Sequence, residues 1–184
     1  MPEILIVAVA VVAFYLWSVY NQLVTIKTRI QASIQEIGNQ LKRQADLIPN
    51  LVSSVKGYMK HEKAIFDELT EARKAIMKVV DSGDPQKLID ASQRLQSAFA
   101  PIRAVFESTP QLQAAGPTTK LMDELRDTAD KVMYSRRTLI DLTADYNIKT
   151  VTFPSNLVAK MFGFKQEAGL KVPEGETTTP KVEL

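Results

Sequence analysis

The chain opens with a segment that is apolar on every face. From Ile4 to Tyr20, every residue except Ser18 is apolar or aromatic. Such a run covers about 26 Å as a helix, close to the ~30 Å hydrocarbon core of a bilayer. We therefore predict that residues 1–22 form a membrane-spanning anchor in contact with the lipid bilayer, whose representative lipid-facing residues are Ile4, Leu5, Ile6, Phe14, Leu16 and Trp17.

The anchor is expected to be retained. The flank before it, Pro2-Glu3, has no basic residue, and no small-x-small cleavage site follows the apolar run. A buried core helix is the alternative, but all later helical segments are amphipathic and this one is not.

Positive charge follows the anchor. Lys27, Arg29, Lys42 and Arg43 oppose a single acid, Glu36, over residues 21–45. The positive-inside rule then predicts a single-pass protein of the cell membrane with its C-terminal part in the cytoplasm.

After the anchor, apolar residues recur at steps of three and four, which is typical of amphipathic helices. The first helix should continue from the anchor as one rod to about Ala45. Pro49 should break it, with Asp46 as the N-cap of a second helix that runs to about Val80. Gly83, Asp84 and Pro85 then predict a helix end followed by a helix start.

Two further long helices follow from Pro85 to about Phe106 and from about Thr118 to Tyr146, separated by a loop at 108–117. Ser155 is expected to cap a short helix that ends at Gly163. The prediction is an all-α protein: an antiparallel four-helix bundle at 23–150, a short amphipathic segment at 151–165 and a disordered tail at 166–184.

Composition argues against most chemistry. The net charge is +2, there is no Cys and the single His is His61. No Glu-x-x-His motif for a di-iron site, no zinc ligand set and no phosphate-binding glycine loop occurs. We expect no enzyme activity, metal, cofactor, small-molecule substrate or nucleic acid partner, and we expect His61 to lie on the surface.

Two groups of residues are candidates for contacts. Lys42, Arg43, Asp46, Pro49 and Asn50 form a candidate interaction surface, although capping and helix initiation would also explain Asp46 and Pro49. An apolar set near the end of the chain either plugs the open end of the bundle, which we favour, or lies in the lipid headgroup layer. That set comprises Phe153, Leu157, Val158, Met161, Phe162 and Phe164.

Three blocks of this sequence resemble the LemA family. They are Tyr20-Asn21 ahead of Leu23-Val24; QLKRQADLIPNLVSSVKGYMKHE at 40–62; and DYNIKTVTFPSNLVAKMFGFK at 145–165, with Tyr146-Asn147 and FPSN inside it. The resemblance covers about residues 4–165 and implies a membrane-anchored bundle of long helices. The family's biochemical role is unsettled, so the resemblance informs architecture more than function.

The chain departs from the family pattern at Ile34, at Gly38, at Ala115–Thr118 and at Leu139-Ile140. We therefore expect a divergent member whose partner differs. The predicted function is a membrane-anchored helical scaffold that presents a surface to an unidentified protein partner. The alternative is a self-assembling structural protein that polymerises at, or shapes, the membrane as a homo-oligomer; an enzyme with an unrecognised site is a third.

Overall fold

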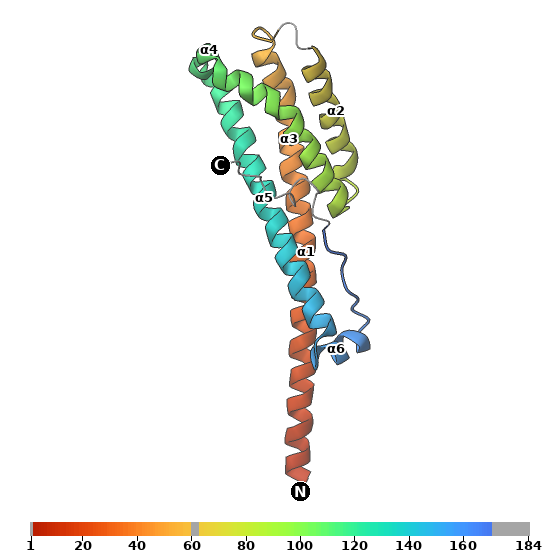
Figure 1. The fold of residues 1–184 in the computed structure, drawn as a ribbon. Coiled ribbons are helices and arrows are strands. Elements are labelled where there is room, and N and C mark those ends of the chain that lie inside the picture. The colour runs from red at the N-terminus through yellow and green to blue at the C-terminus, as the bar shows by residue number, and fades with distance from the viewer. Residues whose placement is uncertain (1, 60–62, 171–184) are drawn as a thin grey trace, which may run out of the picture. The chain divides into compact units, whose positions relative to one another are not determined.

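The computed structural model describes residues 2–59 and 63–170. All regular elements within these ranges are α-helices, which confirms the predicted fold class. They are α1 (Pro2–Val55), α2 (Lys63–Val80), α3 (Pro85–Ser108), α4 (Pro110–Ala114), α5 (Gly116–Val151) and α6 (Ser155–Met161) (Figure 1).

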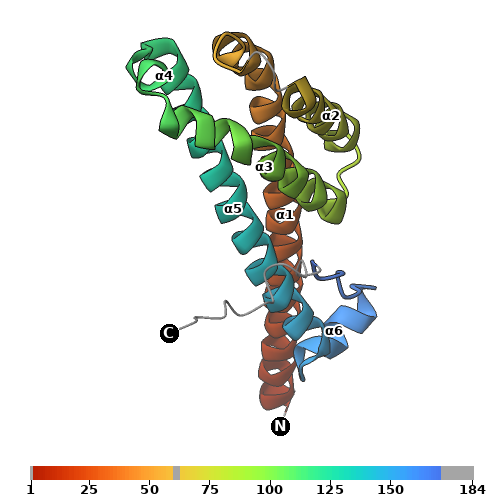
Figure 2. The same ribbon diagram turned by 45° about the horizontal axis from the view of Figure 1, so that its top comes forward.

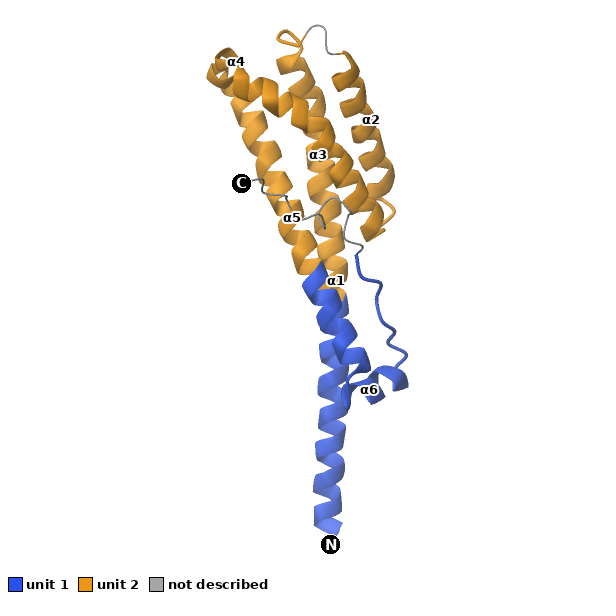
Figure 3. Ribbon diagram, in the orientation of Figure 1, with its two compact units in different colours: residues 1–27, 140–184 blue, residues 28–139 orange. Residues whose placement is uncertain are grey.

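The chain divides into two compact units (Figure 3). The first, which we call the anchor unit, combines residues 1–27 with residues 140–184. The second, the bundle unit, consists of residues 28–139. The anchor and the closing segment of the chain thus belong to the same unit although they lie at opposite ends of the sequence.

The bundle unit contains the C-terminal part of α1, the helices α2, α3 and α4, and the N-terminal part of α5. Figures 1 and 2 both show α2 and α3 side by side. Their apolar stripes face inward, as the three-to-four spacing predicts. The core is formed by fully or nearly fully buried side chains from four helices: Ile37, Leu41, Ile48, Leu51, Leu69, Ile76, Leu88, Leu95, Ile102 and Val132.

The turn between α2 and α3 was predicted correctly. Gly83 adopts a left-handed conformation with φ of 63°. Asp84 is the N-cap of α3, where its Oδ1 accepts hydrogen bonds from the backbone N–H groups of Gln86 and Lys87 at 3.0 and 3.2 Å. Pro85 takes the first helical position, where a missing N–H leaves no bond unmade.

Several predicted boundaries were wrong. Helix α1 does not break at Pro49 but continues to Val55, and the second helix begins only at Lys63. Gly57 lies just after the end of α1. Glycine disfavours a helix interior by about 1 kcal/mol relative to alanine, so this position favours the end of the helix. The predicted loop at 108–117 contains α4, and α5 starts at Gly116 with Pro117 in its first turn, where proline is tolerated.

The anchor unit contains the N-terminal part of α1, the C-terminal part of α5, α6 and the segment after it. Its core includes Val19, Leu23, Leu142, Tyr146 and Val158, all buried. Residues 162–170 follow α6 without a further helix. Of the predicted disordered tail, residues 171–184 lie outside the described residues.

Among the described residues, α1 is the helix that is long and apolar enough to span a membrane. Its most apolar stretch of 18 residues has a mean hydropathy of 2.1, and only 6% of that stretch is buried. Leu5, Phe14 and Trp17 are each more than 60% exposed. A buried core helix would hide these side chains, so the exposure argues against that alternative.

Candidate functional site

The predicted interaction residues lie on one exposed side of α1 in the bundle unit. Lys42, Arg43, Asp46, Pro49 and Asn50 are all exposed. They recur at intervals of three and four, so the helix places them along one face. The alternate positions are buried and pack into the core: Leu41, Ala45, Ile48 and Leu51. We call the five exposed residues the α1 face.

Pro49 is tolerated inside α1 because a second helix replaces the hydrogen bond that it cannot make. Proline has no backbone N–H, so the carbonyl of Ala45, four residues earlier, loses its partner within the helix. Arg73 on α2 donates from Nε to this carbonyl at 2.9 Å. The prediction that Asp46 caps a new helix is therefore wrong, because Asp46 lies within a helix that does not end.

One member of the α1 face contacts α5. Arg43 donates from Nε to the Glu124 carboxylate at 2.9 Å, and its terminal nitrogen pairs with the same oxygen. The two side chains are 53% and 37% exposed. Exposed ion pairs of this kind contribute about 0–1 kcal/mol to stability. Breaking the pair so that Arg43 could contact another molecule would therefore cost little free energy.

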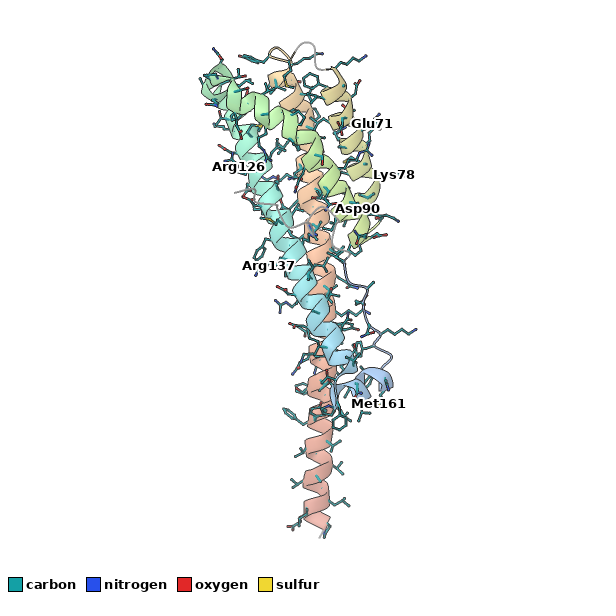
Figure 4. All side chains as sticks on the ribbon, viewed as in Figure 1. Glu71, Lys78, Asp90, Arg126, Arg137 and Met161 are labelled. Atoms are coloured by element: carbon teal, nitrogen blue, oxygen red, sulfur yellow. The ribbon has the colours of Figure 1, made fainter. Side chains whose placement is uncertain are left out.

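The predicted interfacial segment is split between two environments. Val158 is 1% exposed and packs into the core of the anchor unit, so it does not belong to the exposed face of α6. Phe153, Leu157, Met161 and Phe162 are 74%, 57%, 59% and 51% exposed; Met161 can be seen on α6 in Figure 4. These four side chains form an exposed apolar set in the anchor unit, and both predicted roles, the plug and the interfacial segment, stay predictions.

Aromatic contacts fix this segment beside the end of the predicted membrane span. The ring of Tyr20 lies 4.8 Å from that of Phe162 and 5.7 Å from that of Phe164, between ring centroids. Gly163, with φ of 73°, ends α6 and turns the chain so that both phenylalanines reach Tyr20. Its role as the helix stop was predicted.

Ser155 does not cap α6 as predicted. The N-cap position belongs to Pro154, and Ser155 is the first helical residue. Its hydroxyl donates instead to the carbonyls of Lys149 and Thr152 at 2.7 and 2.9 Å. Lys149 lies in the last turn of α5, where carbonyls have no N–H donor within the helix, and Thr152 directly follows that helix. Ser155 therefore joins the two helices.

A polar clasp ties the segment after α6 to both long helices of the anchor unit. The Asn147 side chain donates to the Glu167 carbonyl and accepts from the Glu167 backbone N–H, both at 2.9 Å. The Glu167 carboxylate pairs with Lys27 at 3.1 Å. This hydrogen bond raises the pKa of Lys27, and partial burial opposes the shift.

Tyr146, next to the clasp, is completely buried. Burial raises the pKa of its phenol, which Lys27 opposes electrostatically. Its hydroxyl has no hydrogen-bond partner among the described residues. Sequence spacing did not reveal the clasp, because Asn147 and Glu167 are separated by a helix and two turns.

No group of three His, Cys, Asp or Glu side chains that could hold a metal ion occurs within the described parts of the chain. His61 lies outside the described residues, so its predicted surface position has no structural test. The described residues offer an exposed apolar span in the anchor unit and an exposed helix face in the bundle unit.

The LemA family model matches residues 33–184, which is most of the chain. The chain belongs to the LemA family. The match confirms the family resemblance that the three sequence blocks indicated.

Curated relatives of this LemA protein include magnetosome proteins. Magnetosome protein MamQ of Magnetospirillum gryphiswaldense MSR-1 is 26% identical over 189 residues, covering 89% of this chain and 70% of the relative. Magnetosome proteins MamQ 2 and MamQ 1 of Paramagnetospirillum magneticum AMB-1 are each 26% identical over 182 residues, covering 86% of this chain and 67% of each relative.

The two longer family blocks of the LemA protein have distinct places in the structure. The first, from Gln40, carries the α1 face and the end of α1. The second, from Asp145, carries the clasp and α6. Sequence reasoning located both blocks but missed Arg73, which lies outside them. Pro49 was the signal that could have indicated such a residue. A helix that contains a proline leaves one carbonyl without an N–H donor, so a donor from another element is expected.

Proposed function

We propose that this LemA protein is a membrane-anchored scaffold whose α1 face binds a protein partner. Pro49 carries the proposal. An interior proline disfavours a helix by about 3 kcal/mol relative to alanine, yet this one is exposed and is accommodated by Arg73. The stability of α1 itself does not account for a proline at this position. Its rigid exposed ring between Asp46 and Asn50 suits recognition by another molecule.

The membrane part of the proposal rests on the exposure of α1 and on α6. Phe153, Leu157, Met161 and Phe162 are exposed apolar side chains, of which Phe162 lies beside Tyr20. Lys160 and Lys165 flank them in the sequence. An apolar face edged by lysines suits the headgroup layer. The basic residues after the span orient the bundle unit toward the cytoplasm.

Site-specific photocrosslinking tests the partner surface in native membranes. A photoreactive residue in place of Asn50 should form a discrete crosslink to a different protein. The matched control is Arg137, which is exposed on α5 of the bundle unit (Figure 4). The combined change Lys42→Gln, Asp46→Asn should remove the product, whereas Asp67→Asn, Lys78→Gln on α2 should not.

The same experiment separates the second candidate function. Met133 and Tyr134 are adjacent on α5 and are 63% and 74% exposed, which favours contacts between copies of the chain. If the crosslink at position 50 joins two copies of this protein, the self-assembling structural protein is supported and the scaffold is not. Absence of any protein crosslink at position 50 contradicts both uses of the α1 face.

A further inference from the structure

A groove lies in the anchor unit at the end of the predicted membrane span. It is open, with a volume of about 360 Å³, within the range of small-ligand sites. The groove is lined by six residues from one face of α1 and one residue of α5: Trp17, Ser18, Asn21, Gln22, Thr25, Ile26 and Lys149.

The lining changes from apolar to polar along the helix. Trp17 belongs to the predicted span and is 64% exposed, as an indole in an interfacial belt would be. Asn21 and Thr25 come one and five residues after Tyr20, or about 1.5 and 7.5 Å further along a helix. The headgroup layer is about 5–8 Å deep on each side of the hydrocarbon core. The polar part of the groove therefore falls at headgroup depth.

Hydrogen bonds inside the groove hold its single cation in place. Lys149 donates from Nζ to Gln22 Oε1 at 3.0 Å, and Gln22 donates from Nε2 to Ser18 Oγ at 3.4 Å. An ammonium has three N–H donors, so two remain to reach a ligand in the groove. The side chains of Asn21 and Thr25 supply further neutral donors.

The charge of the groove selects for an anion. Lys149 is the charged member of the described lining residues, and no acid is among them. Asp145, one helical turn before Lys149, does not line the groove. A phosphate beside Lys149 would meet an ammonium and amide or hydroxyl donors, while its acyl chains would run along Trp17 and the exposed span.

From this geometry we infer that the groove binds the headgroup of an anionic phospholipid, with Lys149 on the phosphate and Trp17 beside the upper acyl chain. The inference rests on the proposed membrane anchoring. It gives the protein a preference among lipids, which the span alone, being uncharged, does not provide. Its ligand class is an anionic glycerophospholipid such as phosphatidylglycerol.

The protein carries its own reporter for this site, because Trp17 is its single tryptophan. The full chain would be reconstituted in vesicles of phosphatidylcholine and phosphatidylglycerol, with bromine placed near the headgroup end of the acyl chains of one lipid at a time. Bromine quenches nearby tryptophan. We expect quenching by brominated phosphatidylglycerol to exceed its share of the bilayer about fivefold, since a basic side chain at the surface is worth about that factor.

Matched variants assign the preference to the groove. Lys149→Gln should reduce the enrichment at Trp17 to the bulk lipid ratio, and Lys149→Arg should retain it. Lys131→Gln removes the same charge from the same helix, in the part of α5 that belongs to the bundle unit, and should leave the enrichment unchanged. No enrichment in the wild type, or an equal loss in Lys131→Gln, overturns the site.

Two controls separate the remaining outcomes. Inorganic phosphate and chloride at matched ionic strength should affect the quenching equally; a loss with phosphate alone would identify a free-anion site and overturn the lipid assignment. Absence of quenching by either brominated lipid would contradict membrane anchoring itself, a result distinct from quenching without selectivity. Far-UV circular dichroism confirms that the variants remain folded.

Discussion

At the scale of single residues, the fold depends on side chains that hydrogen-bond backbone groups left without a partner in their own segment. Pro49 leaves the Ala45 carbonyl without an intrahelical donor, and Arg73 supplies one. Asn147 satisfies both backbone groups of Glu167 in a segment that has no helix of its own. Both cases join residues far apart in sequence, so neither can be read from local propensity.

The first prediction concerns Arg73. Replacing it with alanine leaves the partly buried Ala45 carbonyl unpaired, and should lower the free energy of unfolding by about 1–3 kcal/mol. In the Pro49→Ala background the helix regains its own N–H donor, so the same change should cost clearly less. Urea unfolding of the full chain in detergent, followed by circular dichroism, measures this coupling.

Lys78→Ala, an exposed change on the same helix (Figure 4), is the control and should alter stability little in either background. Equal effects of Arg73→Ala with and without Pro49 would show that the guanidinium stabilises α1 for a reason unrelated to the proline.

The second prediction concerns the clasp. Asn147→Ala removes two hydrogen bonds to Glu167 and should release residues 164–170, so that their amides exchange hydrogen much faster. Lys27→Gln removes the exposed ion pair only, worth about 0–1 kcal/mol, and should have a smaller effect. Hydrogen exchange read by mass spectrometry compares the two. Unchanged exchange in Asn147→Ala would show that aromatic packing on Tyr20 alone holds the segment.

At the scale of elements, the sequence predicted helix type and order well and helix ends unevenly. The Gly83-Asp84-Pro85 junction was predicted in full, because every residue there acts on its own neighbours. The predicted break at Pro49 was wrong because the donor that replaces its missing N–H, Arg73 on α2, lies 28 residues beyond Ala45. The lipid groove was also out of reach, since it depends on a contact between residues 127 positions apart.

The third prediction is a pH dependence of α3. The backbone N–H of Lys87, with its ammonium and the N–H of Gln86, holds the pKa of Asp84 below its ordinary value. A lowered folded-state pKa means that the cap stabilises fully above the ordinary aspartate pKa of about 3.9 and is lost as the pH falls through the lowered value. Asp84→Asn keeps the capping oxygen without the charge.

Thermal unfolding between pH 5 and pH 2.5 therefore should show a steeper loss of stability on acidification in the wild type than in Asp84→Asn. Glu71, whose pKa is lowered by its hydrogen bond with Lys74, is present in both proteins and cancels in the comparison. Parallel pH profiles would show that the Asp84 charge does not contribute to the cap.

At the scale of the whole molecule, we propose that one protein combines a lipid-facing span with a water-facing bundle. The fourth prediction tests this division with paired substitutions. Val9→Arg with Val12→Arg places two charges in the span, each costing about 2.5–3.5 kcal/mol in a bilayer, and should release the protein from membranes. Met133→Arg with Tyr134→Arg changes equally exposed apolar residues of α5 and should leave it membrane-bound.

Alkaline extraction of cell membranes followed by immunodetection distinguishes the two pairs. Release of both would point to a peripheral association through several surfaces. Retention of both would show that the first segment is not what holds the protein at the membrane.

The proline in α1 also settles how two helices are matched along their lengths. Apolar stripes repeat every turn, so α2 could shift along α1 by one turn, about 5.4 Å, and still pack against apolar side chains. The gap at Ala45 exists at one height only, and Arg73 reaches it in one alignment. If α2 slipped by one turn, the Ala45 carbonyl and the Arg73 guanidinium would both lose their hydrogen-bond partner. The proline therefore fixes the register of α2 against α1. Moving Pro49 and Arg73 together by one turn should therefore be tolerated better than moving either alone.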